Sequence, residues 1–233
     1  AEVLPLGDGV VALGWGVPAS VWDVPSGKER CELRRAEVIR ARPFPNGDRL
    51  VTGAFEDRRA LIWSARTCAL LLELPHADWL VDIAVSGGAV LAMDMHGAVS
   101  AWDQDSGMLL RTLQAPPVQD PAYGLWPFPD GHRLATVYRQ NLVIWNVTSG
   151  VALSNISHAG VESVAVAPGG DALAACAGAA VFLWDTRTGS ELAPPLRSAG
   201  AQGRHRSCFV ALAWSAVLGD GFRGPSWRSP EAQ

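Results

Sequence analysis

The sequence predicts an all-β fold built from repeated four-stranded sheets, and two landmarks that recur along its 233 residues carry this prediction. The first landmark is a short apolar strand that ends in tryptophan, followed by a polar residue and, five positions after the tryptophan, a turn residue. The tryptophans are Trp22, Trp63, Trp102, Trp145 and Trp184, spaced 41, 39, 43 and 39 residues apart. A period of about 40–45 residues with a Trp-Asp step is the sequence mark of a β-propeller blade.

The second landmark is a glycine-containing turn ahead of each tryptophan strand. It begins at Leu6-Gly7-Asp8-Gly9 and returns in four further copies at the same spacing. In those four copies a leucine follows the last glycine of the turn by three positions: Leu50, Leu91, Leu134 and Leu173. Two independent landmarks in register over five copies indicate five blades.

On these residues the chain resembles WD40-repeat proteins, and the resemblance covers residues 1–193. It implies a WD40-type β-propeller with blades at 1–34, 35–74, 75–114, 115–156 and 157–193. We expect Pro194-Pro195 to end strand pairing, so that 194–233 forms a loop, one further strand at 208–215 that begins a partial sixth blade, and an irregular C-terminal tail. An incomplete seven-bladed ring is the favoured interpretation, and a closed five-bladed ring is the alternative.

The five repeat tryptophans are expected to be structural and to fill the gaps between neighbouring blades. Burial of about 150–250 Å² of aromatic surface is worth roughly 4–6 kcal/mol per residue as an upper estimate. In the family, a hydrogen-bond chain from this Trp through Ser/Thr and His to Asp often supports it, and every blade here lacks at least one member. Blade two has Thr52 without the His, and blades three and five have His76 and His158 without the Asp. We therefore expect apolar packing to dominate.

Composition limits the function classes. With 48% hydrophobic and 18% charged residues the chain is not disordered, and its net charge of −4 gives no reason to expect nucleic acid or a membrane surface as a partner. The four cysteines, Cys31, Cys68, Cys176 and Cys208, form no CxxC pair. We expect them to be reduced and mostly buried in an intracellular protein, cytoplasmic or alternatively nuclear.

No pattern in the sequence indicates catalysis. The five histidines fall in expected turns or loops, and no two stand at metal-ligand spacing. The chain has no P-loop, no GxSxG elbow and no HExxH motif. We therefore expect a non-enzyme with no catalytic residue, no cofactor and no metal.

With catalysis not indicated, the surface loops are the remaining candidates for a functional site. The resemblance places the loops before the first strand and between the second and third strands of each blade on one face, where family members bind partners. The chain's candidates there are Asp78, Trp79, Arg58, Arg59 and Arg139. Trp79 lies outside the repeat register, and Trp and Arg are the residue types enriched at interface hot spots. Its alternative role is to cover the edge of its own blade.

A finer resemblance lies in blade five. Trp184-Asp185-Thr186-Arg187 is similar to the WDxR box, which implies docking on the cullin-4 ubiquitin-ligase adaptor through Arg187. Three hypotheses follow. The first is a non-catalytic scaffold that presents proteins or peptides on the loop-rich face. The second is a substrate receptor of a cullin-4 ligase, and the third is a regulatory propeller region of a larger multidomain protein.

Overall fold

The computed structural model describes residues 2–14, 17–33, 38–54, 58–113, 122–139, 141–178 and 180–197. Within these ranges the chain forms twenty β-strands, and the strands form five antiparallel four-stranded sheets. Each sheet contains four strands that are consecutive in sequence, paired in chain order. This is the blade arrangement that the two sequence landmarks predict.

The strands of blade one are β1 (Glu2–Leu6), β2 (Gly9–Gly14), β3 (Val17–Asp23) and β4 (Lys28–Leu33). Blade two has β5 (Val38–Pro43), β6 (Arg49–Ala54), β7 (Arg59–Ser64) and β8 (Leu70–Pro75). Blade three has β9 (Leu80–Ser86), β10 (Ala89–Asp94), β11 (Val99–Asp103) and β12 (Leu109–Leu113). Blade four has β13 (Ala122–Pro127), β14 (Arg133–Tyr138), β15 (Asn141–Asn146) and β16 (Ala152–Ser157), and blade five has β17 (Val161–Val166), β18 (Ala172–Ala177), β19 (Ala180–Asp185) and β20 (Glu191–Arg197).

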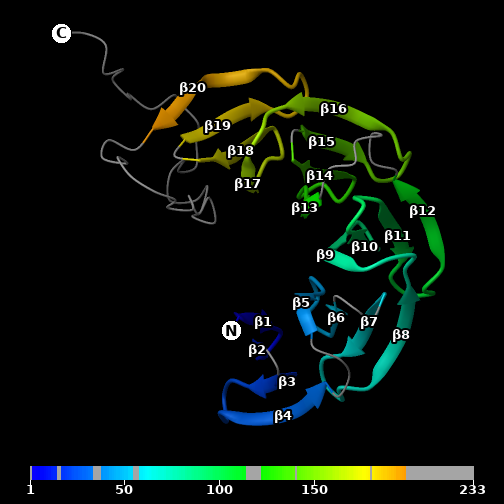
Figure 1. Cartoon of the computed structure of the whole chain (residues 1–233). Coiled ribbons are helices and arrows are strands. Elements are labelled where there is room, and N and C mark those ends of the chain that lie inside the picture. Colours follow the sequence, from blue (N-terminus) through cyan, green and yellow to red (C-terminus); the bar gives the residue numbers. More distant parts are fainter. Residues whose placement is uncertain are drawn as a thin grey trace.

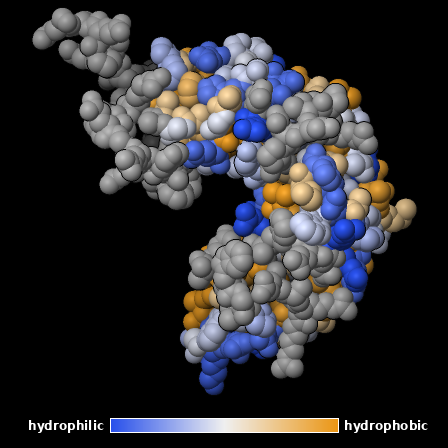
Figure 2. Space-filling view, viewed as in Figure 1, coloured by the Kyte–Doolittle hydropathy of each residue, from blue (hydrophilic) through white to orange (hydrophobic). Residues whose placement is uncertain are grey.

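The blades follow one another around an open arc (Figure 1). The first strand of each blade lies on the inner side of the arc and the fourth on the outer rim. Figure 2 shows that the inner side is hollowed and that hydrophilic residues gather over β4 at the lower edge. Apolar residues show both in the gaps between blades and along the outer rim. Those on the rim include the exposed leucines of the outer strands, such as Leu71, Leu110 and Leu153.

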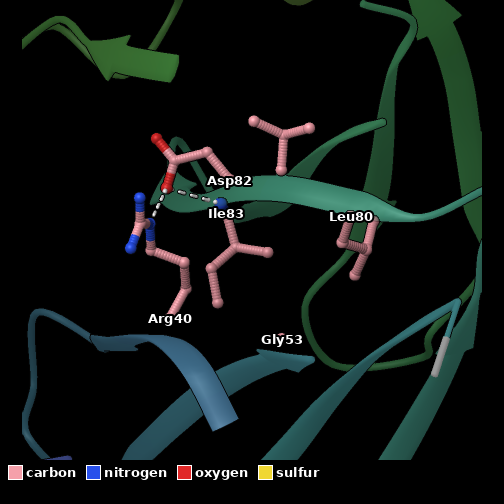
Figure 3. Close-up of a pocket in the computed structure, with 6 residues that line it drawn as sticks. Arg40, Gly53, Leu80, Asp82 and Ile83 are labelled. Carbon is pink, nitrogen blue, oxygen red and sulfur yellow. Dashed lines mark hydrogen bonds and ion pairs between the residues drawn. The ribbon is translucent and has the colours of Figure 1, made fainter. Parts of the chain in front are cut away.

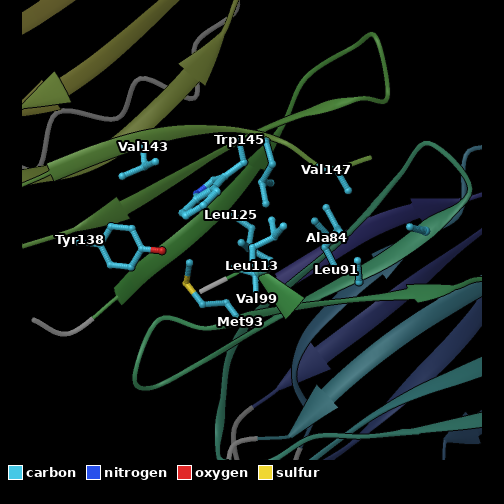
Figure 4. Close-up of a cluster of buried hydrophobic side chains, with 13 residues drawn as sticks. Ala84, Leu91, Met93, Val99, Leu113, Leu125, Tyr138, Val143, Trp145 and Val147 are labelled. Atoms are coloured by element: carbon cyan, nitrogen blue, oxygen red, sulfur yellow. The ribbon is translucent and has the colours of Figure 1, made fainter. Parts of the chain in front are cut away.

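The core consists of separate apolar layers, one between each pair of neighbouring blades. In blades two to four the second and third strands are buried along most of their length, as β6, β10 and β15 illustrate, because both sheet faces meet another blade. Figure 4 shows the layer between blades three and four, where Met93 and Val99 meet Tyr138 and Trp145. Cohesion of the arc therefore comes from face-to-face sheet packing.

Four repeat tryptophans each pack on the preceding blade, which confirms their expected burial. Trp63 joins the layer with blade one, Trp102 that with blade two, Trp145 that with blade three and Trp184 that with blade four. Their exposed fractions are between 2% and 8%. Trp22 is 36% exposed. Its face of blade one has no preceding blade in the described structure, so the expectation of a buried Trp22 is wrong.

The polar residue after each tryptophan caps the turn to the outer strand. Its side-chain oxygen accepts the backbone N–H three residues later in every blade, as Asp103 does from Ser106 at 2.7 Å and Asn146 from Ser149 at 2.8 Å. The turn residue five after the tryptophan then donates its N–H to the carbonyl of the capping residue, at 2.8–2.9 Å in all five blades. This explains why the sequence phrase repeats with fixed spacing.

Glycines bring the turns between first and second strands close together across two blade interfaces. Gly7 of blade one lies against Gly47 of blade two, and Gly87 of blade three lies against Gly131 of blade four. A Cβ on Gly47 would lie 2.8 Å from Gly7 Cα, closer than real side chains approach backbone. All four have positive φ, which L side chains rarely adopt.

The prediction that Pro194-Pro195 ends strand pairing at Ala193 is wrong. Strand β20 continues to Arg197, with Ala193 opposite Leu183 and Leu196 opposite Val181. The two prolines thus occupy a bulge, opposite a single residue of β19. Because β20 is an edge strand, its outer side needs no ladder hydrogen bonds, and prolines are tolerated there. The expected strand at 208–215 and the tail lie outside the described residues.

The expectation of reduced cysteines is wrong, because none of the described cysteines is free and Cys176 of β18 is disulfide-bonded as well. Cys31 on β4 and Cys68 in the turn after β7 form a disulfide between blades one and two, with Cα atoms 6.2 Å apart. That separation lies within the range that disulfides span. The sequence spacing of the two residues is 37, so the crosslink closes a loop of about one blade.

Candidate functional site

The arc has two ends that differ in their connections. At the turn end lie the short turns from first to second and from third to fourth strand. At the loop end lie the connections between second and third strands and between successive blades. The antiparallel strand order fixes this division in every blade. Five of the expected partner-binding residues belong to the loop end, and Arg187 belongs to the turn end.

The structure brings three of the expected residues together at the loop end over blade three. Asp78 and Trp79 lie in the connection between β8 and β9, and Arg58 lies in the loop before β7. Two residues that sequence analysis did not select, Met95 and His96, join them from the loop between β10 and β11. We call these five residues the loop patch. Their loops are joined because Met95 N donates to Trp79 O at 3.0 Å.

Both large side chains of the loop patch are partly exposed. Trp79 is 36% and Met95 38% exposed, whereas the repeat tryptophans of blades two to five are buried. Trp79 therefore does not belong to the inter-blade core, as expected from its position outside the repeat register. An indole and a thioether at one surface give an apolar, polarisable contact area of the kind that binds protein side chains.

Charged groups border this apolar area. The Asp78 carboxylate pairs with His96 Nε2 at 3.1 Å and accepts the Trp79 N–H at 2.8 Å. The hydrogen bond from the Trp79 N–H lowers the pKa of Asp78 below its ordinary value; burial opposes this, and His96 and Arg58 add smaller lowering effects. Asp78 therefore stays ionised at neutral pH and orients the backbone of Trp79.

Arg58 adopts a left-handed backbone conformation, with φ of 47°, that side chains other than glycine rarely take. Its carbonyl accepts the N–H of His76 at 2.7 Å. Arg58 and Cys68 are the two described non-glycine residues with positive φ.

The structure does not gather the other three expected residues into this patch. Arg59 starts β7 and pairs with Glu73 of β8, Nη1 to Oε2 at 2.7 Å, within its own blade. Arg139 follows β14 in blade four, where its carbonyl accepts the Gly160 N–H at 3.3 Å. Arg187 is exposed in the turn between β19 and β20, where its N–H donates to Asp185 Oδ1 at 2.9 Å.

A second polar group lies on the inner side of the arc, where sequence analysis predicted nothing. Asp82 of β9 reaches toward blade two, where Arg40 Nε lies 3.6 Å from its Oδ1 (Figure 3). Arg42 Nη2 lies 3.3 Å from the same oxygen. Asp82 Oδ2 accepts the Leu125 N–H of blade four at 3.0 Å. Burial raises the pKa of Asp82, and the two arginines and the Leu125 and Ile83 N–H groups only partly oppose this. Asp82 thus links three blades.

The residues around Asp82 do not form a ligand cavity. Leu80, Ile83 and Gly53 line the space beside Arg40, and its empty volume of about 130 Å³ includes open solvent (Figure 3). The described residues contain no group of three His, Cys, Asp or Glu side chains that could hold a metal. No helix in the described part of the chain is long and apolar enough to cross a membrane.

Within the described residues, the first step of the expected hydrogen-bond chain forms in blades two and four and is missing in blade three. Trp63 Nε1 donates to Thr52 Oγ1 and Trp145 Nε1 to Thr136 Oγ1, both at 2.8 Å. In blade three the position equivalent to these threonines is Ala92. Among the described residues, Trp102 Nε1 and His76 Nδ1 are the buried side-chain nitrogens without a hydrogen-bond partner.

Comparison with known proteins gives a fold and no family. The sequence matches no protein-family model and no curated protein. Among solved structures, the crystal structure of the computationally designed Ika8 protein (crystal packing No.1 in P63) superposes with a TM-score of 0.68 at 19% identity. The superposition covers 82% of this chain and 59% of that chain. The likeness shows the fold alone: an all-β, propeller-like arc of four-stranded blades.

Proposed function

We propose that this chain is a non-catalytic scaffold that binds other proteins or peptides through the loop patch, Arg58, Asp78, Trp79, Met95 and His96. The observation that carries the proposal is the partial exposure of Trp79 and Met95 on two loops that are hydrogen-bonded to each other. The Asp78–His96 pair borders them, so a bound segment meets an apolar centre with a polar rim, the usual anatomy of a protein interface.

The fitting ligand is a segment with one large apolar side chain for Trp79 and Met95 and polar groups on either side. Arg58 and His96 favour a carboxylate of the ligand, while Asp78 favours a donor. Because the Asp78 carboxylate already orients the backbone of Trp79, the patch needs little rearrangement on binding.

The experiment is an affinity capture from cell extract with three baits: the natural chain, Trp79→Ala and Arg187→Ala. We expect partners that bind the natural chain and Arg187→Ala alike, and that bind Trp79→Ala about tenfold more weakly or less. Binding of each captured partner is then measured with purified components. A partner set unaffected by Trp79→Ala contradicts the loop patch as the binding site.

The turn end supports a second candidate function, a substrate receptor of a cullin-4 ubiquitin ligase. Its basis is the WDxR-like sequence at Trp184–Arg187 and the surface position of Arg187. The same capture experiment separates the two. If the cullin-4 adaptor is bound by the natural chain and lost with Arg187→Ala, the receptor function replaces the plain scaffold.

We further infer that the arc is WD40-type and belongs to a larger, seven-bladed ring. The support is the open face of blade one: Trp22 is 36% exposed there, and a Cβ on Gly27 would meet nothing within 4 Å. The equivalent face in blades two to five is covered by the preceding blade. Electron microscopy of the protein as isolated from cells tests this, and a ring closed by five blades overturns it.

A further inference from the structure

The disulfide between Cys31 and Cys68 occupies a contact that recurs at every blade interface. At each interface the turn between third and fourth strands of one blade lies against the outer strand of the preceding blade. A Cβ on Gly107 would lie 3.5 Å from the Leu72 side chain, one on Gly150 3.6 Å from Arg111, and one on Gly189 2.7 Å from Ser154. Cys68 occupies the position equivalent to these glycines in its own blade.

Cys31 holds the matching position on the other side of the contact. It pairs with Val21, the residue before the repeat tryptophan, as Leu72 pairs with Ile62 and Ser154 with Ile144. Both members of one recurring contact are therefore cysteine at one interface. At the interfaces between blades two and three, three and four, and four and five, the turn member is glycine.

Cysteine at position 68 is unfavourable for the turn itself. The four equivalent glycines have φ between 65° and 78°, and Cys68 has φ of 54° in the same left-handed region. Glycine takes this conformation without strain, whereas a side chain does not. The crosslink to Cys31 is the feature that offsets this strain.

Within the described residues blade one packs on a single neighbouring blade, as blade five does at the other end of the arc. Blade one packs on blade two through Leu6, Val11, Leu33 and their neighbours, while its opposite face carries Trp22 and Val3 at 36% and 63% exposure. In a linear array, a unit with one neighbour lacks the second interface that stabilises inner units. In the described structure the crosslink is thus a second attachment of blade one, beside its one apolar interface.

We propose that Cys31 and Cys68 form a redox-controlled crosslink that holds blade one against blade two. Both residues are half-buried, so that a small thiol can reach the sulfurs. Reduction consumes two thiols RSH: a thiolate attacks one sulfur to give a mixed disulfide, a second thiolate releases RSSR, and two protein thiols remain. An oxidant that accepts two electrons reverses the change. In the reduced state blade one opens locally while blades three and four, which contain no cysteine, keep their structure.

The test measures hydrogen exchange by mass spectrometry on the oxidised protein before and after treatment with reduced glutathione. Peptide mapping of the oxidised protein first shows a linked Cys31–Cys68 peptide. We expect amides of β1–β4 to exchange roughly tenfold faster or more after reduction, with blades three and four unchanged. The midpoint of thermal unfolding falls by about 5–15 °C on reduction.

The matched control is Cys68→Gly, which restores the turn residue of the other blades and removes the link. Its blade one exchanges fast with or without glutathione. The proposal is overturned if oxidation leaves Cys31 and Cys68 unlinked, if reduction leaves β1–β4 as protected as before, or if all blades respond equally. It is also overturned if β1–β4 of Cys68→Gly still exchange faster after thiol treatment, because the response of blade one then comes from another disulfide, such as that of Cys176.

Discussion

The indole of Trp63 and the hydroxyl of Thr52 are joined by a 2.8 Å hydrogen bond inside the layer between blades one and two. Trp145 and Thr136 repeat the same bond between blades three and four. In blade three the threonine position is Ala92, which is fully buried, and Trp102 Nε1 has no partner among the described residues. The blades therefore share one packing scheme but differ in how completely its polar atoms are satisfied.

Substitution Ala92→Thr should stabilise the protein relative to Ala92→Val by about 1–2 kcal/mol, because the two differ only in the hydroxyl that Trp102 Nε1 can reach. The valine variant carries the same added volume and so measures any overpacking. Thr52→Val should destabilise by about 1–3 kcal/mol, since it leaves Trp63 Nε1 buried and unpaired. Urea unfolding of the four proteins gives the values. Equal midpoints for Ala92→Thr and Ala92→Val would show that the hydroxyl finds no indole.

Trp63→Ala should destabilise the chain by about 3–5 kcal/mol, because the indole is buried against blade one and its loss leaves a cavity. Trp22→Ala should have an effect of about 1 kcal/mol or less, since the indole is 36% exposed on the open face. Both are measured by denaturant unfolding with tryptophan fluorescence and circular dichroism. If Trp22→Ala is as damaging as Trp63→Ala, the open face is covered in solution.

Acid should weaken the turns that the Trp-Asp step caps. The Ser106 hydroxyl and N–H lower the pKa of Asp103 below its ordinary value. A lowered folded pKa gives stability that is present above the unfolded pKa and is lost as pH falls through the folded value. Asp103→Asn keeps an acceptor oxygen, as Asn146 does in blade four, and should lose less stability between about pH 5 and pH 2.5. The reverse exchange, Asn146→Asp, should make the acid loss steeper.

Asp82 should show the opposite pH dependence. Because burial raises its pKa in the folded protein, its contribution to stability is present below the unfolded pKa and is lost as pH rises through the folded pKa. The stability difference between the natural chain and Asp82→Asn should therefore decrease as pH rises above about 4. Unfolding free energies measured across this range give the slope. A difference that grows with pH would mean that Arg40 and Arg42 outweigh the burial.

Local pattern predicted much of the fold. The Trp strands, their capping residues and the turn glycines recur because each blade needs the same strand packing and the same capped turn to its outer strand. The structure confirms all five four-stranded blades. The exposure of Trp22 could not be predicted, because it depends on which blade covers a face and on nothing in the strand itself. The bulge at Pro194-Pro195 was missed since proline is excluded only from ladders that need its N–H, and the edge of β20 does not.

The candidate site was predicted in part. The position of Trp79 outside the repeat register identified a surface tryptophan, and the structure places Asp78 and Arg58 beside it. Met95 and His96 were missed, although they belong to the same loop end, because exposure of a loop methionine has no sequence signal. The disulfide did have a sequence signal. Aligning the repeats shows Cys68 at a glycine position and Cys31 at the position equivalent to Leu72 and Ser154. Asp82 was missed because a single acid in an apolar strand does not reveal its partners.

The contact between Gly7 and Gly47 also has a geometric consequence. The backbones of two turns without side chains are in direct contact here, and this contact limits how closely blades one and two approach at the turn end. An alanine at position 47 would act as a wedge and tilt the two sheets apart at that end. Every later blade would be carried along by this tilt, so one methyl group would change the pitch of the whole arc.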